Sequence, residues 1–368
     1  MKSLNFVLMS ESEHHKDSAL KVHDGIDQPD AVSPEAAKRF KEIRPKSLEA
    51  VEYVRAILNG DRAVLSKAIT MVESALPRHQ ELAQQIIEAC VPHAGRSLRI
   101  GITGVPGVGK STFIEALGKH LTSQGNRIAV LAIDPSSRRS RGSILGDKTR
   151  MEDLANDPNA FIRPSSSAGT LGGVTRNTRE SVILCEAAGY NIIFVETVGV
   201  GQSETAVHSM VDFFLLLMLA GAGDELQGIK RGIMEMADAI VINKADGDNI
   251  PKAEIAAREY SNALHLFPPS PSGWTPRVMT ASSTEGTRIR EVWEMVIEYE
   301  REVKATGYFD ARRKEQALQA FTDTVEETIR QKFFNNPDVM SLIPGLQKDI
   351  LSGKISPYAA ALRLVSGH

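Results

Sequence analysis

Short apolar runs alternate with stretches of helical character from residue 98 onward. The runs are rich in isoleucine and valine, and they cover residues 99–104, 128–134, 161–163, 192–196, 213–219, 239–243 and 277–281. Short apolar runs that loops bound and helices separate are typical of buried strands in βαβ units. We therefore predict an α/β fold with a mainly parallel central sheet that helices cover on both faces.

The regions on either side of this α/β part are predicted to be helical. Between residues 47 and 95, apolar residues recur at spacings of three and four, and Pro77 and Pro92 interrupt the pattern. Helical patterns return at residues 291–304 and 313–334, and residues 337–368 carry further apolar stripes. Residues 1–46 are polar and lack a sustained period, which predicts a partly disordered tail with one short helix.

These patterns divide the chain into four predicted parts. They are a tail at 1–46, an N-terminal helical extension at 47–95, an α/β domain at 96–305 and a C-terminal helical arm at 306–368. The apolar stripes of the arm have two interpretations, because they could pair two chains or could close the core of their own chain.

Composition and charge narrow the class of protein. The 368 residues are 42% hydrophobic and 24% charged, which is ordinary for a globular protein, and the net charge of −3 argues against a general nucleic-acid binder. The longest apolar run, at 213–223, is too short to cross a membrane, and no signal peptide is visible. Cys90 and Cys185 cannot form a disulfide framework. We expect a cytoplasmic protein that binds neither nucleic acid nor membranes.

A phosphate-binding loop follows the first apolar run. Its residues are Gly104, Val105, Pro106, Gly107, Val108, Gly109, Lys110 and Ser111, which match the pattern G-x-x-x-x-G-K-[ST]. A helical stretch opens at Thr112, so the motif lies between a strand and a helix, as a P-loop requires. Glycines let backbone N–H groups converge on phosphate oxygens, Lys110 should reach the β- and γ-phosphates, and Ser111 should bind Mg²⁺.

A second motif predicts which base is bound. Asn243, Lys244, Ala245 and Asp246 end the run at 239–243 and form the NKxD pattern of GTP-binding proteins. The Asp246 carboxylate can accept hydrogen bonds from N1–H and N2–H₂ of guanine, and adenine has no matching pair of donors. After the next run, a backbone N–H of Ala281 or Ser282 is expected to contact guanine O6. A surface turn is the alternative for NKxD alone.

A third set of candidate residues could bind Mg²⁺ or the γ-phosphate, and the first of them lies at the end of the run at 192–196. Glu196 stands where most GTPases have aspartate, and Gly199 follows at the position that meets the γ-phosphate. Asp134 and Asp147 are further candidate carboxylates near a Mg²⁺ ion, although Asp134 could equally cap a helix and Asp147 could be a solvated loop residue. Val200 cannot orient a water as glutamine does, so hydrolysis by the chain alone is expected to be slow.

Together these motifs resemble the methylmalonyl-CoA mutase-associated GTPases (MeaB type), whose members were often labelled arginine/ornithine transport ATPases. The resemblance runs from about residue 47 to the end, and its specific parts are the stretch at 196–204 and the glycine-flanked loop at 223–230. It implies a G-protein chaperone that gates cofactor loading of an adenosylcobalamin-dependent acyl-CoA mutase and protects that enzyme from inactivation. It also implies a homodimer formed through the C-terminal helices.

The resemblance further implies roles for single residues. Ser111, Asp134, Asp147 and Glu196 would surround Mg²⁺. An extra switch loop that responds to the mutase would contribute Asp224, Gln227 and Lys230, which join Lys110 and Glu196 as the expected catalytic residues. The cofactors implied are GTP or GDP and Mg²⁺.

Three alternatives remain at this point. An ATP-dependent kinase serving amino-acid transport would share the P-loop but would have no use for residues 243–246. A nickel-inserting GTPase would commonly carry histidine-rich tracts or paired cysteines, and this chain has only His14 and His15 side by side. A scaffold that holds nucleotide without turnover would not need Lys110, Ser111 and Glu196.

Overall fold

The computed structural model describes residues 48–133, 151–164, 171–197, 203–221 and 231–367, all of which belong to one compact unit. Its centre is a sheet of seven described strands in the order β3-β2-β4-β1-β5-β6-β7, and every neighbouring pair is parallel. The strands are β1 (Leu98–Gly104), β2 (Ile128–Ile133), β3 (Ala160–Arg163), β4 (Ile192–Thr197), β5 (Phe213–Leu219), β6 (Ala239–Asn243) and β7 (Arg277–Thr280). The predicted fold class is confirmed, and the predicted strand bounds differ by one residue at most.

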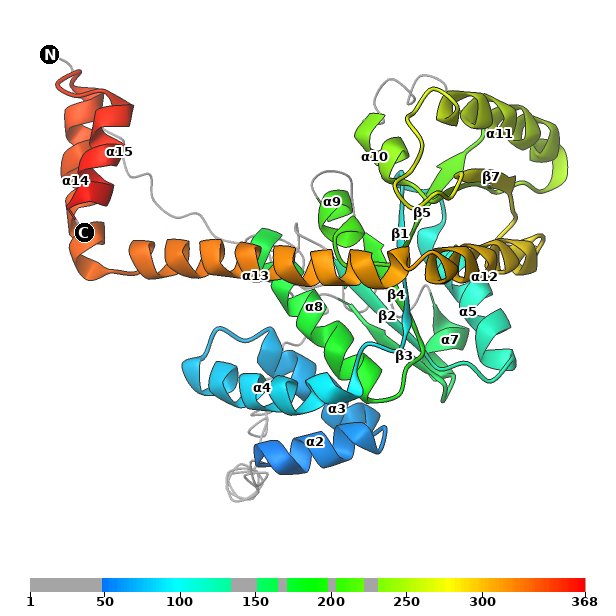
Figure 1. The fold of residues 1–368 in the computed structure, drawn as a ribbon, viewed down its shortest axis with the longest axis horizontal. Coiled ribbons are helices and arrows are strands. Elements are labelled where there is room, and N and C mark those ends of the chain that lie inside the picture. The colour runs from blue at the N-terminus through cyan, green and yellow to red at the C-terminus, as the bar shows by residue number, and fades with distance from the viewer. Residues whose placement is uncertain (1–47, 134–150, 165–170, 198–202, 222–230, 368) are drawn as a thin grey trace, which may run out of the picture. The chain divides into compact units, whose positions relative to one another are not determined.

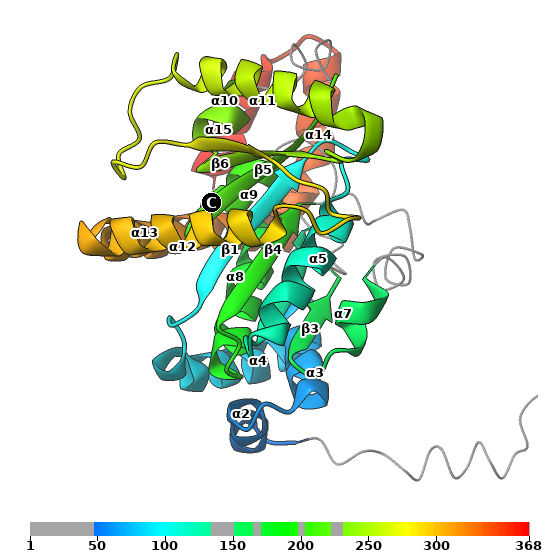
Figure 2. The ribbon, with the colours of Figure 1, turned by 90° about the vertical axis from the view of Figure 1, so that its right-hand side faces the viewer.

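Helices cover both faces of the sheet (Figures 1 and 2). One face packs against α5 (Lys110–Ser123), α7 (Glu152–Asn156) and α12 (Ile289–Ala305). The other face packs against α8 (Leu171–Ala187), α9 (Ser203–His208), α10 (Arg231–Met236) and α11 (Ile250–Leu264), and against the N-terminal helices α2 (Ala50–Leu58), α3 (Arg62–Val72) and α4 (Pro77–Cys90). The short 3₁₀ turns η1 (Val91–His93) and η3 (Gly247–Asn249) complete this part.

Local sequence explains where several of these helices begin. Asp61 caps α3 by accepting hydrogen bonds from the N–H groups of Ala63 and Val64, and Pro77 occupies the first turn of α4, where its missing N–H costs nothing. Buried side chains on one side of each helix then attach it to the sheet. Phe113 and Leu117 of α5 are examples, and full burial of such a side chain contributes about 1.5–3 kcal/mol.

The C-terminal helices are α13 (Tyr308–Phe334), α14 (Pro337–Leu351) and α15 (Pro357–Ser366). The helix α13 leads from α12 to α14 and α15, which pack against each other (Figure 1). It begins at Tyr308, five residues earlier than the predicted helix, because Tyr308 and Phe309 pack into the main core. The predicted arm at 306–368 is therefore attached to the α/β core through its first turns. None of the described helices is long and apolar enough to cross a membrane.

Candidate guanine-nucleotide site

The parallel order of the strands brings the sequence motifs to one edge of the sheet. The P-loop follows β1, Glu196 is the next-to-last residue of β4, Asn243 ends β6, and Ser282 follows β7. The carboxyl ends of parallel strands all meet at this edge, which is where α/β proteins bind ligands. Asp134, Asp147, Gly199, Asp224, Gln227 and Lys230 lie outside the described residues.

The P-loop has the backbone that its glycines predict. Gly104 has φ of +153°, and a Cβ atom at this position would lie 2.3 Å from the Leu217 carbonyl oxygen, so a side chain cannot be accommodated. Gly109 is left-handed, with φ of +91°, and caps α5. The helix begins at Lys110 rather than at Thr112, so the free N–H groups of its first turn belong to the motif itself.

Lys110 is held inside the loop that it belongs to. Its Nζ donates to the Gly104 carbonyl at 2.8 Å and lies 3.5 Å from the Val105 carbonyl oxygen. Burial lowers the pKa of Lys110, and the negative charges of Glu196 and Glu204 oppose that shift. The carbonyl oxygens that accept its hydrogen bonds are neutral, so the ammonium group can turn toward a phosphate group, which offers it a stronger, charged partner.

Two hard oxygen donors lie together beside the loop. The Ser111 hydroxyl donates to Oε1 of Glu196 at 3.3 Å, and Glu196 is 5% exposed. The hydroxyls of Thr103 and Thr197 lie 2.9 Å apart and connect β1 to β4. Hydroxyl and carboxylate oxygens fit Mg²⁺, which commonly takes one or two carboxylates together with substrate phosphates. Such a site needs no larger cluster, and the described ranges contain no group of three or more His, Cys, Asp or Glu placed to hold a metal.

Asn243 connects the base-reading motif to the P-loop. Its Nδ2 donates to the Val108 carbonyl at 2.8 Å, and its Oδ1 accepts from the N–H of Ser283 at 3.2 Å and from the Ser283 hydroxyl at 2.7 Å. Lys244 next to it is left-handed, with φ of +59°, and its carbonyl accepts from Asn249 Nδ2 at 2.6 Å. One buried amide thus fixes three segments that are far apart in the sequence.

The N–H groups of Ala281 and Ser282, which are expected to contact guanine O6, both donate hydrogen bonds within the chain in this structure. The Ala281 N–H donates to the Ile242 carbonyl at 2.9 Å, and the Ser282 N–H donates to the Thr287 carbonyl at 3.1 Å. Ile242 is buried, so a contact of the Ala281 N–H with guanine O6 would leave a buried carbonyl without its donor. Ser282 instead contributes its side chain, whose hydroxyl donates to Oδ2 of Asp246 at 2.6 Å.

Sequence reasoning missed three residues of this region. Ser283 holds Asn243, Asn249 holds the Lys244 turn, and Glu204 is a second buried carboxylate that acts on Lys110. Ser283 directly follows the segment singled out after β7, so its position along the chain was a usable signal. Glu204 ends the stretch at 196–204 on which the family resemblance rests, but nothing in its spacing indicates that it is only 2% exposed.

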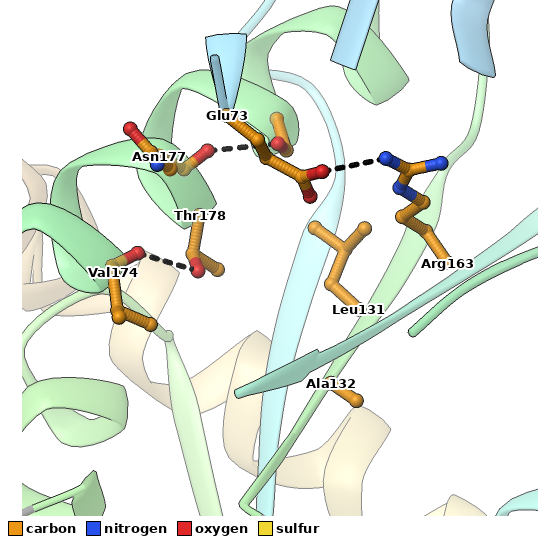
Figure 3. Close-up of a pocket in the computed structure, with 8 residues that line it drawn as sticks. Glu73, Leu131, Ala132, Arg163, Val174, Asn177 and Thr178 are labelled. Atoms are coloured by element: carbon orange, nitrogen blue, oxygen red, sulfur yellow. Dashed lines mark hydrogen bonds and ion pairs between the residues drawn. The ribbon is translucent and has the colours of Figure 1, made fainter. Parts of the chain in front are cut away.

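A small pocket lies away from the P-loop, between α3, α8 and the ends of β2 and β3 (Figure 3). Arg163 and Glu73 form an ion pair across it, with 2.5 Å between Nη2 and Oε2. Thr178 closes another side and donates its hydroxyl to the Val174 carbonyl at 2.9 Å. No P-loop or base-reading residue lines it, so it does not belong to the nucleotide site.

Several known proteins are similar to this chain in sequence. A Mycobacterium tuberculosis protein named "Probable GTPase" is 51% identical over 310 residues, which are 84% of this chain and 92% of that protein. The "Methylmalonic aciduria type A homolog, mitochondrial" of Mus musculus is 44% identical over 359 residues, covering 95% of this chain and 86% of the mouse protein.

A solved structure agrees with these sequence relatives. The crystal structure of an LAO/AO transport system kinase is 40% identical and superimposes with a TM-score of 0.69, covering 86% of this chain and 96% of that one. Residues 65–338 match the family model described as "Methylmalonyl Co-A mutase-associated GTPase MeaB". The match spans the P-loop, Glu196 and the base-reading motif, and it confirms the family resemblance of the sequence. This chain therefore belongs to the MeaB family of P-loop GTPases, which bind guanine nucleotides and hydrolyse GTP.

Proposed function

We propose that this chain is a GTP-hydrolysing chaperone of an adenosylcobalamin-dependent acyl-CoA mutase, with methylmalonyl-CoA mutase as the first candidate. The observation that carries the proposal is the hydrogen bond from Asn243 to Val108, because it joins the base-reading motif to the phosphate loop. That assembled site lies in a chain whose residues 65–338 match a mutase-associated GTPase family. Hydrolysis would then gate cofactor loading and protect the mutase from inactivation.

The described residues have distinct parts in the proposed site. Asp246 reads guanine, Asn243 and Lys244 brace the loop beneath the base, and the residues of the P-loop with Thr112 surround the phosphates. Lys110 turns from the Gly104 carbonyl to the β- and γ-phosphates, where its charge stabilises the transferring phosphoryl group. Ser111 and Glu196 would hold Mg²⁺, with Asp134 and Asp147 as further carboxylates, and the ion would neutralise phosphate charge.

The proposed response to the mutase involves the loop at 223–230. We assign Asp224, Gln227 and Lys230 to it as switch residues, on the strength of the family resemblance. A lysine that a partner surface orders near the γ-phosphate supplies positive charge where the transition state gains negative charge. This arrangement would make hydrolysis slow in the free protein and faster in the complex.

A second copy of the chain is the other proposed partner. On α13, Leu318, Phe321, Val325 and Ile329 recur at spacings of three and four, and within the described unit they are 70%, 68%, 39% and 62% exposed. Exposed apolar residues continue on α14 and α15, including Leu351, Tyr358 and Leu362. An apolar stripe of this length on exposed helices is typical of a helix–helix interface. We therefore propose a homodimer in which the stripe pairs with the same stripe of a second chain.

One alternative function is favoured by a specific comparison. The solved relative with a TM-score of 0.69 is named a transport system kinase. A kinase that uses ATP would need a site for adenine, whereas Asp246 offers a carboxylate to two guanine donors. The nucleotide preference of the purified chain separates the two functions.

The test is nucleotide turnover by the full chain with and without a purified acyl-CoA mutase, combined with co-elution of the two proteins. We expect slow GTP hydrolysis that the mutase accelerates, co-elution in at least one nucleotide state, and no comparable turnover of ATP. Neither acceleration nor co-elution with any such mutase would contradict the chaperone function. Equal turnover of ATP would favour the transport kinase.

A further inference from the structure

The loop that connects β7 to α12 is tied together at its two ends. Thr280 is the last residue of β7, and Arg288 directly precedes α12. Nη1 of Arg288 donates a hydrogen bond to Oγ1 of Thr280, with 2.7 Å between the two atoms. The Thr280 side chain is buried, so the arginine reaches back to a fixed acceptor. We call residues 280–288 the base loop, because it lies beside the base-reading motif.

A second set of contacts closes the base loop from within. The N–H of Ser282 donates to the Thr287 carbonyl at 3.1 Å, and the two residues form an antiparallel bridge. The Glu285 N–H donates to the Ser282 hydroxyl oxygen at 3.2 Å. Arg288 directly follows Thr287, so its side chain and the bridge hold neighbouring positions at the same end of the loop.

The base loop contacts the base-reading motif through successive residues. The Ser282 hydroxyl donates to Oδ2 of Asp246 at 2.6 Å, and the Ser283 hydroxyl donates to Oδ1 of Asn243 at 2.7 Å. The carbonyl of Ala281 accepts from the N–H of the residue before Asp246, at 3.0 Å. The orientation of the Asp246 carboxylate therefore depends on the conformation of the base loop.

Backbone conformation sets Arg288 apart from its neighbours. Among the residues that the structure describes, Lys244 and Arg288 are the two non-glycine residues with positive φ, at +59° each. This conformation is unfavourable for a residue with a side chain and persists where surrounding contacts determine it. Lys244 belongs to the base-reading motif. Arg288 lies at the end of the base loop and does not cap α12 with its side chain, so its conformation serves the contact with Thr280.

We propose that Arg288 is a positioning residue for guanine recognition. Its hydrogen bond to Thr280 keeps the base loop closed, so that Ser282 stays where it orients the Asp246 carboxylate. Arg288 acts through Ser282, and Ser282 acts through Asp246, so the role requires no contact between Arg288 and the nucleotide. The inference rests on the proposed contact of Asp246 with guanine.

The test compares binding of GDP and inosine diphosphate (IDP) to the full chain by calorimetry. The base of IDP lacks the N2 amine of guanine, so the ratio of the two dissociation constants reports the contact of N2–H₂ with Asp246. We expect the wild-type chain to bind GDP about tenfold more tightly than IDP. A change that only loosens the fold would weaken both ligands alike, whereas misorientation of Asp246 weakens GDP more.

Two variants break the contact from opposite sides. Arg288→Gly removes the side chain but adopts the left-handed backbone without strain, and Thr280→Val keeps the branched shape of the buried residue and removes the acceptor. We expect each to lower the preference for GDP over IDP about three- to fivefold, and the double variant to lose no more than the larger single loss. Because either variant breaks the contact, the comparison does not depend on the folding of one protein.

Two further variants act as controls. Arg288→Lys keeps a cationic donor and should retain most of the preference for GDP. Arg290→Ala removes an exposed ion pair with Glu294 on the same helix and should leave the preference unchanged.

Equal weakening of GDP and IDP by Arg288→Gly and Thr280→Val, wild-type preference in both variants, or additive losses in the double variant would overturn the inference and leave the GTPase function intact. A wild-type chain that binds GDP and IDP equally would overturn the proposed contact of Asp246 with guanine, and the inference with it.

Discussion

The hydroxyl of Ser282 donates a hydrogen bond to Oδ2 of Asp246, with 2.6 Å between the two oxygens. The Ser282 side chain is fully buried, and its oxygen accepts from the Glu285 N–H at 3.2 Å. The carboxylate that we propose to read guanine is therefore oriented by a hydroxyl that the loop itself holds in place. Orientation matters because a bidentate contact with N1–H and N2–H₂ requires both oxygens in the plane of the base.

Ser282→Ala is expected to weaken GDP binding about tenfold while leaving weak ADP binding unchanged. The reason is that a hydrogen bond to a charged group contributes about 1.5–3 kcal/mol, and only guanine uses the oriented carboxylate. Calorimetric titrations with both diphosphates measure the difference. Ser270→Ala, in the loop at 267–276, is a control that should keep wild-type affinity. Equal weakening of GDP and ADP would show that Ser282 supports the loop rather than the selection of the base.

Phe321→Lys is expected to convert the proposed dimer into a monomer. It places a charge in the middle of an apolar stripe, where desolvation of the ammonium costs several kcal/mol. Light scattering after size-exclusion chromatography measures the mass, and thermal unfolding shows whether the chain stays folded. Gln319→Lys adds the same charge beside the stripe and should leave the dimer intact. A wild-type monomer at high concentration, or a dimeric Phe321→Lys variant, would rule out this interface.

His208 makes the folded state sensitive to acid. Burial, followed by the Arg312 guanidinium, lowers the pKa of His208 from 6.5 to about 4. Between these values the unfolded chain binds a proton that the folded chain does not, so this histidine reduces stability as the pH falls. Asp238 has the opposite effect, because burial raises its pKa from 3.8 to about 6 and the folded chain then holds the extra proton.

His208→Gln should remove only the contribution of His208 to the pH dependence of the unfolding free energy. Relative to wild type, we expect the variant to gain about 2 kcal/mol of unfolding free energy when the pH drops from 7 to 5. Urea unfolding at the two pH values measures this difference, and wild type serves as the reference at each. If the difference in unfolding free energy between the variant and wild type is the same at both pH values, His208 does not titrate as assigned.

Lys230→Ala is expected to leave GDP affinity near the wild-type value and to abolish the acceleration of GTP hydrolysis by mutase. The positive charge of Lys230 would matter only when the mutase orders the switch loop, so the rate of GTP hydrolysis without mutase should change little. Lys252→Ala, an exposed lysine on α11, is the matched control. If the mutase still accelerates hydrolysis by Lys230→Ala, the switch assignment is wrong.

Much of the fold was predictable because its signals are local. The strands are continuous apolar runs, and the P-loop is a contiguous motif whose strand and helix flank it directly. The side-chain role of Ser282 was not predictable in the same way, since it depends on the residues after β6 and β7 lying side by side. The contacts that attach α13 were not predictable for a related reason: the spacing of its apolar residues shows the exposed stripe but does not indicate that Arg312 bonds to His208 and Arg313 to Asp212. The close packing of Val207 against β1 likewise depends on Gly101, a residue far earlier in the chain.

The central claim is that a guanine nucleotide binds with Mg²⁺ between the P-loop and the segment ending in Asp246. Isothermal titration of the full chain with GDP and with ADP, each in the presence of Mg²⁺, tests it most directly. We predict strong heat from GDP only, and loss of that preference in Asp246→Ala with the P-loop unchanged. No binding of GDP, or equal binding of both diphosphates by the wild-type chain, would contradict the claim.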